Sequence, residues 1–158
     1  MLRTGLMVAA LALVSVGSAS AKSRLQPPHL PERPGANSVA SFPCPRNPVA
    51  TIDIEACQGH ALLKLGHIFN QRVSVLWMLL DADARRTFLR AHAAWLTYRN
   101  EECAARARED AGGTAEAVVF GQCQVELTRA RVSEISETLG DYCQGRARTG
   151  PARRCPRR

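Results

Sequence analysis

The stretch AAWLTYRNEEC, residues 93–103, places aromatic, cationic, anionic and thiol side chains within eleven residues. Such side chains can act together in binding or catalysis, but their spacing also suits one face of a helix. Trp95, Arg99 and Cys103 lie four residues apart, and Tyr98 and Glu102 repeat this spacing. In a helix, Arg99 can lie over the indole of Trp95 and donate to Glu102, while Cys103 ties the helix to a neighbour. We therefore predict that this motif builds the fold rather than contacting a ligand.

The remaining candidates for chemistry are four histidines: His29, His60, His67 and His92. His60 and His67 share a helical face, and a helical hairpin would bring His92 within about one turn of His67. No fixed carboxylate accompanies them to complete a metal site. The sequence also has no glycine-rich phosphate loop and no nucleophile with a base in evident reach. We therefore expect a protein without catalytic activity, metal or cofactor.

Six cysteines follow residue 21: Cys44, Cys57, Cys103, Cys123, Cys143 and Cys155. An even number in a short exported chain is typical of a disulfide framework. No two of them stand two to four residues apart, and none lies near a pair of histidines, as a zinc site would require. We expect disulfides and no structural zinc.

Residues 1–21 have the pattern of a cleaved signal peptide. Arg3 supplies the positive charge, Leu6 to Val16 form an apolar run, and Ala19-Ser20-Ala21 is a small-residue cleavage site. The run is too short to span a bilayer, which takes about 20 residues, and no cysteine follows it to carry a lipid. The pattern predicts a soluble protein, secreted or periplasmic, without a lipid anchor and without a transmembrane segment in its mature form.

The two ends of the mature chain have distinctive compositions. Residues 22–50 hold seven of the nine prolines, each of which fixes φ and removes a backbone donor, so we expect an extended leader that is mobile up to Phe42. Residues 146–158 hold six arginines and no acidic residue, whereas basic and acidic residues balance over 22–145. The positive charge therefore belongs to a basic tail, residues 141–158, where Cys143 and Cys155 are expected to close a loop.

Hydrophobic periodicity between these ends predicts three helices. The first runs from an N-cap at Thr51 to about Leu80, with apolar residues recurring every three or four positions from Leu62 onward. The second begins after a short Asp-Ala-Asp turn, where Asp81 or Asp83 can serve as its cap.

This second helix is expected to run from about Ala84 to Asp110, and Gly112-Gly113-Thr114 separates it from a third that ends at Gly140. No segment alternates with a period of two. We predict an all-α domain over residues 51–140, an antiparallel three-helix bundle. Its third helix is expected to be the shortest, and its first two the longer hairpin.

Antiparallel pairing also suggests which cysteines meet. Cys103 lies ten residues before Gly113 and Cys123 lies ten after it, so the two stand opposite each other across that turn. Cys57 is a second candidate partner for Cys103, but that pair is about one helical turn out of step across the first turn. Among the fifteen connectivities that six cysteines allow, we favour pairing in sequence order: Cys44 with Cys57, Cys103 with Cys123 and Cys143 with Cys155.

Several stretches together resemble one known family. They are Thr51 to Cys57, Phe69-Asn70, Ala91 with Trp95, Tyr98-Arg99 and Glu102-Cys103, Gly112-Gly113-Thr114, and Cys123 with Leu127-Thr128 and Arg131. The family is the N-terminal domain of the LprI-type lysozyme inhibitors, a group of small exported bacterial proteins. The resemblance covers about residues 41–139, and its most specific part is W-x-x-Y-R-x-x-E-C followed by the spaced cysteine and L-T-x-x-R.

The resemblance bears on individual residues as well as on the fold. Seven motif residues are expected to have structural roles: Asn70, Trp95, Tyr98, Arg99, Glu102, Thr128 and Arg131. The chain has Gly66, Val73 and His92 where the family usually or often has Asp, Tyr and Gln. Shorter relatives carry their last two cysteines close together around a tight turn, which implies local pairing and favours Cys103 with Cys123.

The resemblance implies a binding protein whose partner is a lysozyme. The alternative is a structural or interaction protein of the envelope whose arginine-rich tail binds anionic polymers or surfaces, since such tails bind acidic polymers without specificity. Nucleic acid is not an expected partner, because the export signal argues against an encounter and no aromatic residue is interleaved with the tail arginines.

Overall fold

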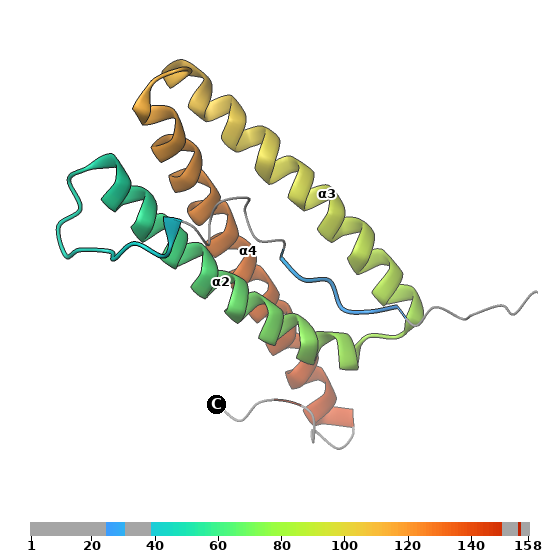
Figure 1. The fold of residues 1–158 in the computed structure, drawn as a ribbon. Coiled ribbons are helices and arrows are strands. Elements are labelled where there is room, and N and C mark those ends of the chain that lie inside the picture. The colour runs from blue at the N-terminus through green and yellow to red at the C-terminus, as the bar shows by residue number, and fades with distance from the viewer. Residues whose placement is uncertain (1–24, 31–38, 150–154, 156–158) are drawn as a thin grey trace, which may run out of the picture.

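A computed structural model describes residues 25–30, 39–149 and 155, although the side chains of residues 146–149 are outside this description. The chain forms three long helices, α2 (Thr51–Leu79), α3 (Ala82–Ala107) and α4 (Thr114–Thr149), with a short 3-10 helix, η1 (Arg108–Asp110), before α4. No strand occurs within the described ranges. Figure 1 shows α3 running antiparallel to both α2 and α4. The predicted all-α, disulfide-linked, antiparallel three-helix bundle is confirmed.

The third long helix, α4, is the one that packs closely along both of the others, whereas the backbones of α2 and α3 stay further apart (Figure 1). Large side chains bridge that wider gap. Trp77 of α2 meets Phe88 of α3 edge to face at 6.4 Å between ring centres, and Phe69 stacks on His92 at 5.2 Å. The prediction that the first two helices form the longer hairpin was wrong, because α4 has 36 residues against 29 in α2 and packs more closely on α3.

The hydrophobic core lies between the C-terminal halves of α2 and α4. Its members recur every three or four residues on both helices: Phe69, Val73, Leu76, Leu79 and Leu80, with Val132, Ile135 and Leu139. This is the spacing that lines one face of a helix, and it matches the apolar stripe read from the sequence. In α3 two of the four buried residues are polar, His92 and Arg99, and the other two are Cys103 and Ala107.

The two helix starts differ in their capping. Asp81 caps α3, because its carboxylate accepts a hydrogen bond of 2.8 Å from the backbone of Ala84. The predicted cap of α2 at Thr51 was wrong by one residue, since Ala50 occupies the N-cap position and no side chain caps that helix there. The turn between α2 and α3 is also shorter than the predicted Asp-Ala-Asp turn, because α3 already begins at Ala82.

The predicted end of the last helix at Gly140 was also wrong. The helix continues to Thr149 and, with 36 residues, is the longest of the three. A glycine inside a helix costs about 1 kcal/mol, which is little beside the packing on either side of it. Leu139 is buried in the core, and Cys143 packs against the core one turn later. The first part of the predicted tail, residues 141–149, therefore belongs to α4.

Part of the proline-rich leader packs against the helices. The backbone N–H of Leu30 donates to Oδ1 of Asn70 at 3.2 Å, and its side chain packs on the core. Figure 1 shows residues 25–30, in blue, lying over the gap between α2 and α3. The expectation of a mobile leader up to Phe42 was wrong for these residues, because proline removes backbone donors without preventing packing.

Three regions of the sequence analysis lie outside the described residues: the predicted signal peptide (1–21), the middle of the leader (31–38) and the tail beyond Thr149 except Cys155. Among the helices that are described, none combines the length and the apolar character that crossing a bilayer requires.

Candidate functional site

Four of the predicted motif residues meet at the interface of α3 and α4. The guanidinium carbons of Arg99 and Arg131 lie 5.1 Å and 5.8 Å from the ring centre of Trp95, within the range of a cation–π interaction. Arg99 also donates a hydrogen bond of 3.2 Å to the hydroxyl of Thr128. The W-x-x-Y-R motif of one helix and the L-T-x-x-R motif of the next therefore form a single cluster.

Arg99 is the most unusual member of this cluster. Only 6% of its surface is exposed, and burial lowers the pKa of its guanidinium. The predicted bond from Arg99 to Glu102 does not form. Glu102 instead accepts from Arg106, one turn further along α3, at 2.9 Å, because Arg99 points toward α4 and Thr128.

The histidines lie in two different environments. His92 is only 3% exposed and stacks on Phe69 and Trp95, with its ring centre 5.2 Å and 6.0 Å from theirs. His60 and His67 are exposed, and they bond to the carbonyl oxygen of Phe42 and to the side chain of Gln71. The predicted approach of His92 to His67 therefore does not produce a shared site, and no group of three metal-binding side chains occurs among the described residues.

The two remaining motif residues lie apart from the cluster. Tyr98 is 52% exposed, and Asn70 holds the leader through Leu30. The geometry of the motif is thus that of a helix interface. A surface for a partner has to be sought elsewhere on the molecule.

One such surface lies on a segment that a disulfide holds against α2. The structure contains three disulfides, all between cysteines adjacent in sequence order: Cys44–Cys57, Cys103–Cys123 and Cys143–Cys155. Cys103–Cys123 joins α3 to α4 in the interior, since both residues are almost fully buried. Cys44–Cys57 is different, because it attaches an irregular segment, residues 42–50, to the first turns of α2.

This 42–50 loop is fixed at a second point, where the ring of His60 bonds to the carbonyl oxygen of Phe42 at 3.0 Å. His60 follows Cys57 by three residues, so both attachments come from one face of α2. Three prolines, Pro43, Pro45 and Pro48, further restrict the backbone of the loop. The sequence analysis did not identify this site, although a proline-flanked segment between two cysteines was visible in the sequence.

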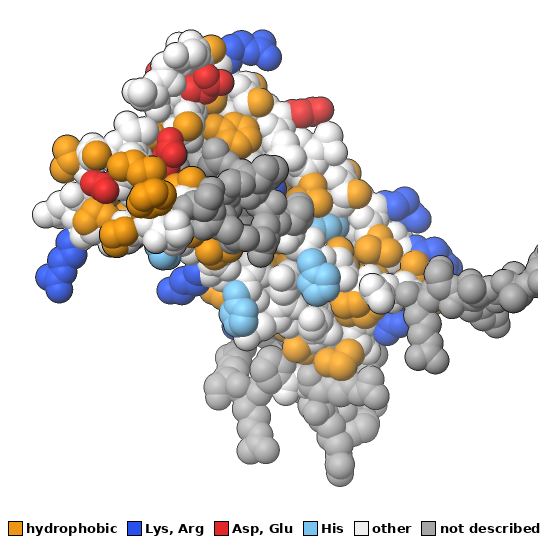
Figure 2. Space-filling view, in the orientation of Figure 1, with side chains coloured by type: hydrophobic (Ala, Val, Ile, Leu, Met, Phe, Trp, Pro, Cys, Tyr) orange, Lys and Arg blue, Asp and Glu red, His pale blue; other side chains and the backbone are white. Residues whose placement is uncertain are grey.

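The 42–50 loop presents apolar side chains to solvent. Phe42 is 51% exposed and Val49 is 86% exposed, and Ile52 in the first turn of α2 is 44% exposed. Figure 2 shows hydrophobic side chains gathered on the left of the view, where Figure 1 places this loop and the start of α2. Exposed apolar groups that lie together often mark a site for a protein partner.

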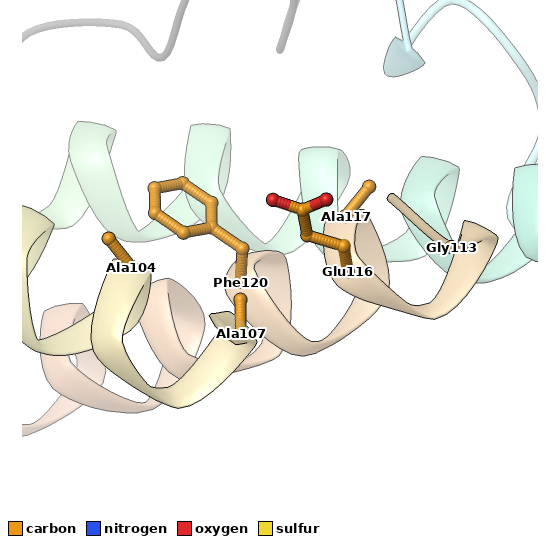
Figure 3. Close-up of a pocket in the computed structure, with 6 residues that line it drawn as sticks. All are labelled: Ala104, Ala107, Gly113, Glu116, Ala117 and Phe120. Atoms are coloured by element: carbon orange, nitrogen blue, oxygen red, sulfur yellow. The ribbon is translucent and has the colours of Figure 1, made fainter. Parts of the chain in front are cut away.

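A hollow of about 350 Å³ opens near the α3–α4 turn, at the same end of the bundle as the loop. Three alanines and Gly113 line it together with the ring of Phe120 and the carboxylate of Glu116 (Figure 3). One oxygen of Glu116 accepts a bond of 2.8 Å from the backbone of Gly112. Among the described residues no lysine or arginine forms an ion pair with this carboxylate.

This end of the molecule is acidic overall. Segments 44–60 and 107–120 contain two arginines, Arg46 and Arg108. They contain five carboxylates: Asp53, Glu55, Glu109, Asp110 and Glu116. The end of the bundle that carries the exposed apolar loop is therefore suited to approach a basic protein.

Comparison with known proteins agrees with the motifs. The family model described as "Lysozyme inhibitor LprI" matches residues 44–135. An "Uncharacterized protein R02472" of Rhizobium meliloti (strain 1021) is 34% identical over 58 residues, which are 37% of this chain and 42% of that relative. This match thus spans less than half of the relative, and the comparison with solved structures gave no match. The family match covers more than half of the chain, including the 42–50 loop from Cys44 onward, all of α3 and the motif cluster. The chain therefore belongs to the LprI family of lysozyme inhibitors.

Proposed function

We propose that this protein is an exported, non-catalytic binding protein that inhibits a lysozyme. The observation that carries the proposal is the family match over residues 44–135. Export is supported by the three disulfides, since such bonds persist in oxidising compartments. The signal-peptide pattern of residues 1–21 is in keeping with it.

Inhibition of a glycosidase requires only that its cleft be blocked. The surface that suits this task is the 42–50 loop, at the same end of the bundle as the hollow, because the loop combines exposed apolar groups with a restrained backbone. A restrained backbone loses little conformational entropy on binding. Apolar side chains that become buried in a complex supply much of its affinity.

Charge also favours this end of the molecule. Animal lysozymes are strongly basic, so a basic partner would be repelled during the approach. The overall charge of +7 on the full chain raises that objection. It loses force at the loop end, where segments 44–60 and 107–120 hold five carboxylates and two arginines. The C-terminal end of α4 lies at the opposite end of the bundle (Figure 1).

The test is a lysis assay with purified mature protein, an animal lysozyme and bacterial cell walls. We expect the rate of lysis to fall as the protein is added in micromolar excess. An unchanged rate over that range, with the helical content and the disulfides verified in the same sample, would contradict the proposal.

A second function is supported by the composition of the tail. Six arginines lie between residues 146 and 158, without an acidic residue among them, and Cys155 is bonded back to Cys143 of α4. Such a loop suits binding to anionic polymers of the envelope, by contacts that weaken as salt rises. This binding can coexist with inhibition, because Cys143, to which Cys155 is bonded, lies on the C-terminal part of α4, away from the 42–50 loop (Figure 1).

Truncation of the tail would not test this second function cleanly, because α4 continues to Thr149 and Cys143 packs on the core. A better variant replaces Arg153, Arg154, Arg157 and Arg158 by glutamine and keeps Cys155. We expect it to elute from an anionic column at distinctly lower salt than the wild type, with lysozyme inhibition retained. Equal elution of the two proteins would exclude the tail as the binding element.

A further inference from the structure

We propose that Arg46 is the residue that blocks the lysozyme, by placing its guanidinium between the two carboxyl groups of the enzyme's cleft. This inference rests on the proposed function and names the residue and the loop that perform it. Arg46 lies in the 42–50 loop, two residues after Cys44, with Pro45 before it and Pro48 after it.

The position of Arg46 makes it available to a partner. Its side chain is exposed, and no carboxylate of the described residues forms an ion pair with it. It lies in a stretch of six residues, 45–50, between the Cys44–Cys57 disulfide and the start of α2. All six are exposed except Pro48, which is half-buried. The loop thus exposes a cation that has no ion-pair partner among the described residues, on a backbone that the disulfide holds in place.

The chemistry of the cleft matches this cation. A retaining glycosidase such as lysozyme carries two carboxyl groups about 5–5.5 Å apart. A guanidinium is planar, keeps its charge and has five donors, so it can bond to two carboxylates at once. Lysine would present a single compact charge and could not form the same paired contact.

The charges around Arg46 are complementary to those around the cleft. The enzyme has an acidic cleft within a basic surface, and this end of the inhibitor has a basic residue within an acidic surface. The exposed side chains of Phe42, Val49 and Ile52 lie on the same segment and the helix start that follows it. On binding they would exclude water around the guanidinium, which strengthens a buried charge pair.

Restraint of the loop is the remaining requirement. The disulfide and the bond from His60 to Phe42 fix its first residues, and α2 fixes its last. Little freedom is therefore lost when the loop enters a cleft. Arg108, the other arginine of segments 44–60 and 107–120, lies on η1 and not in the 42–50 loop. It serves as the matched control.

The experiment measures inhibition of an animal lysozyme by the wild-type mature chain and by the variants Arg46→Gln and Arg108→Gln. Both variants remove one positive charge from exposed positions at the same end, so both should fold. We expect Arg46→Gln to inhibit about 30-fold more weakly or worse, as for a central interface residue, and Arg108→Gln to stay within about twofold of the wild type. A soluble N-acetylglucosamine oligomer that fills the cleft should weaken binding of the wild-type protein to the enzyme, measured directly by surface plasmon resonance.

The outcomes separate this inference from the proposed function. Inhibition that is unchanged in Arg46→Gln, or binding of the wild type that the oligosaccharide does not weaken, would overturn the role of Arg46 and leave the function standing. Equal losses in both arginine variants would show a general effect of charge and would overturn it as well. Absence of inhibition by the wild type would overturn both.

Discussion

Two guanidinium groups share the ring of Trp95, and one of them, that of Arg99, is almost fully buried without a carboxylate partner. A buried charge of this kind is costly unless its surroundings compensate it. The indole face and the hydroxyl of Thr128 provide that compensation for Arg99. The arrangement depends on the flat shape of the guanidinium as much as on its charge.

Arg99→Lys is therefore expected to destabilise the fold although it keeps the charge. Lysine cannot stack flat on Trp95 or reach Thr128 with the same geometry, and we expect a loss of about 1–3 kcal/mol in the free energy of unfolding. Urea denaturation followed by circular dichroism measures it. Arg129→Lys, at an exposed position of α4, is the control and should change stability by less than about 0.5 kcal/mol. Equal stability of both variants would contradict this account of the cluster.

His92 gives the fold a dependence on pH. Burial lowers the pKa of its ring, the charges of Arg131 and Arg99 lower it as well, and the backbone of His29 opposes them. Neither ring nitrogen has a partner at normal hydrogen-bond distance and angle among the described residues, and burial is the largest of these influences. The folded protein therefore keeps His92 neutral at a pH where the unfolded chain binds a proton. The resulting stability is complete above about pH 6.5, the pKa in the unfolded chain, and is lost as the pH falls below it.

The variant His92→Gln should remove this part of the pH dependence. Glutamine does not titrate, so we expect its free energy of unfolding to fall less than that of the wild type between pH 7.5 and 5.5. Urea denaturation at the two pH values measures the difference. The exposed His67 offers a control, because His67→Gln should retain the wild-type dependence. A wild-type slope in His92→Gln would show that other groups cause it.

At the scale of the elements, the apolar stripe of α2 could be read from the sequence because Phe69, Val73 and Leu76 repeat at helical spacing. The inward face of α3 could be read only from its motif, since His92 and Arg99 are polar and hydrophobicity alone would place them outside. The end of α4 was missed because Gly140 resembles a stop signal. The helix in fact continues to Thr149, and the packing of Cys143 on the core beyond Gly140 could not be inferred from the sequence. The 42–50 loop was missed as a site because exposure of Phe42 and Val49 depends on where the helices lie.

Two glycine substitutions test the observed ends of α4. Gly140 lies inside the helix without a positive φ, and apart from its chain neighbours and the nearby backbone of the helix, no described atom lies within 4 Å of the position that a Cβ would take. We expect Gly140→Ala to stabilise the protein by about 0.5–1 kcal/mol. Gly112, in the turn before α4, has a φ of 79°, which favours glycine, so Gly112→Ala should destabilise by about 1 kcal/mol. Thermal unfolding compares them, and a destabilised Gly140→Ala would contradict the uninterrupted helix.

At the scale of the whole molecule, charge is unevenly divided along the chain. Carboxylates outnumber arginines in segments 44–60 and 107–120, at the loop end of the bundle, and six arginines lie in residues 146–158. A basic enzyme should consequently be oriented toward the loop before contact, an effect that acts on the rate of association more than on the rate of dissociation.

This division predicts how binding responds to salt. Raising the ionic strength from 0.01 M to 0.15 M shortens the screening length from about 30 Å to about 8 Å. We expect the association rate constant for an animal lysozyme to fall several-fold over this range while the dissociation rate changes little. Surface plasmon resonance gives both rates. The double variant Glu109→Gln and Glu116→Gln should associate more slowly at low salt and show a weaker response, and an association rate that rises with salt would exclude steering by this end.

The order of the disulfides has a consequence for how the protein is made. The bonds span 13, 20 and 12 residues, and none of them encloses or crosses another. When a chain enters an oxidising compartment from its N-terminus, each first cysteine of a pair therefore meets its correct partner as the next cysteine to arrive. Cysteines that pair in the order in which they enter the compartment therefore form the native disulfides. We expect an oxidant to be sufficient for this, without an isomerase that rearranges wrongly paired cysteines.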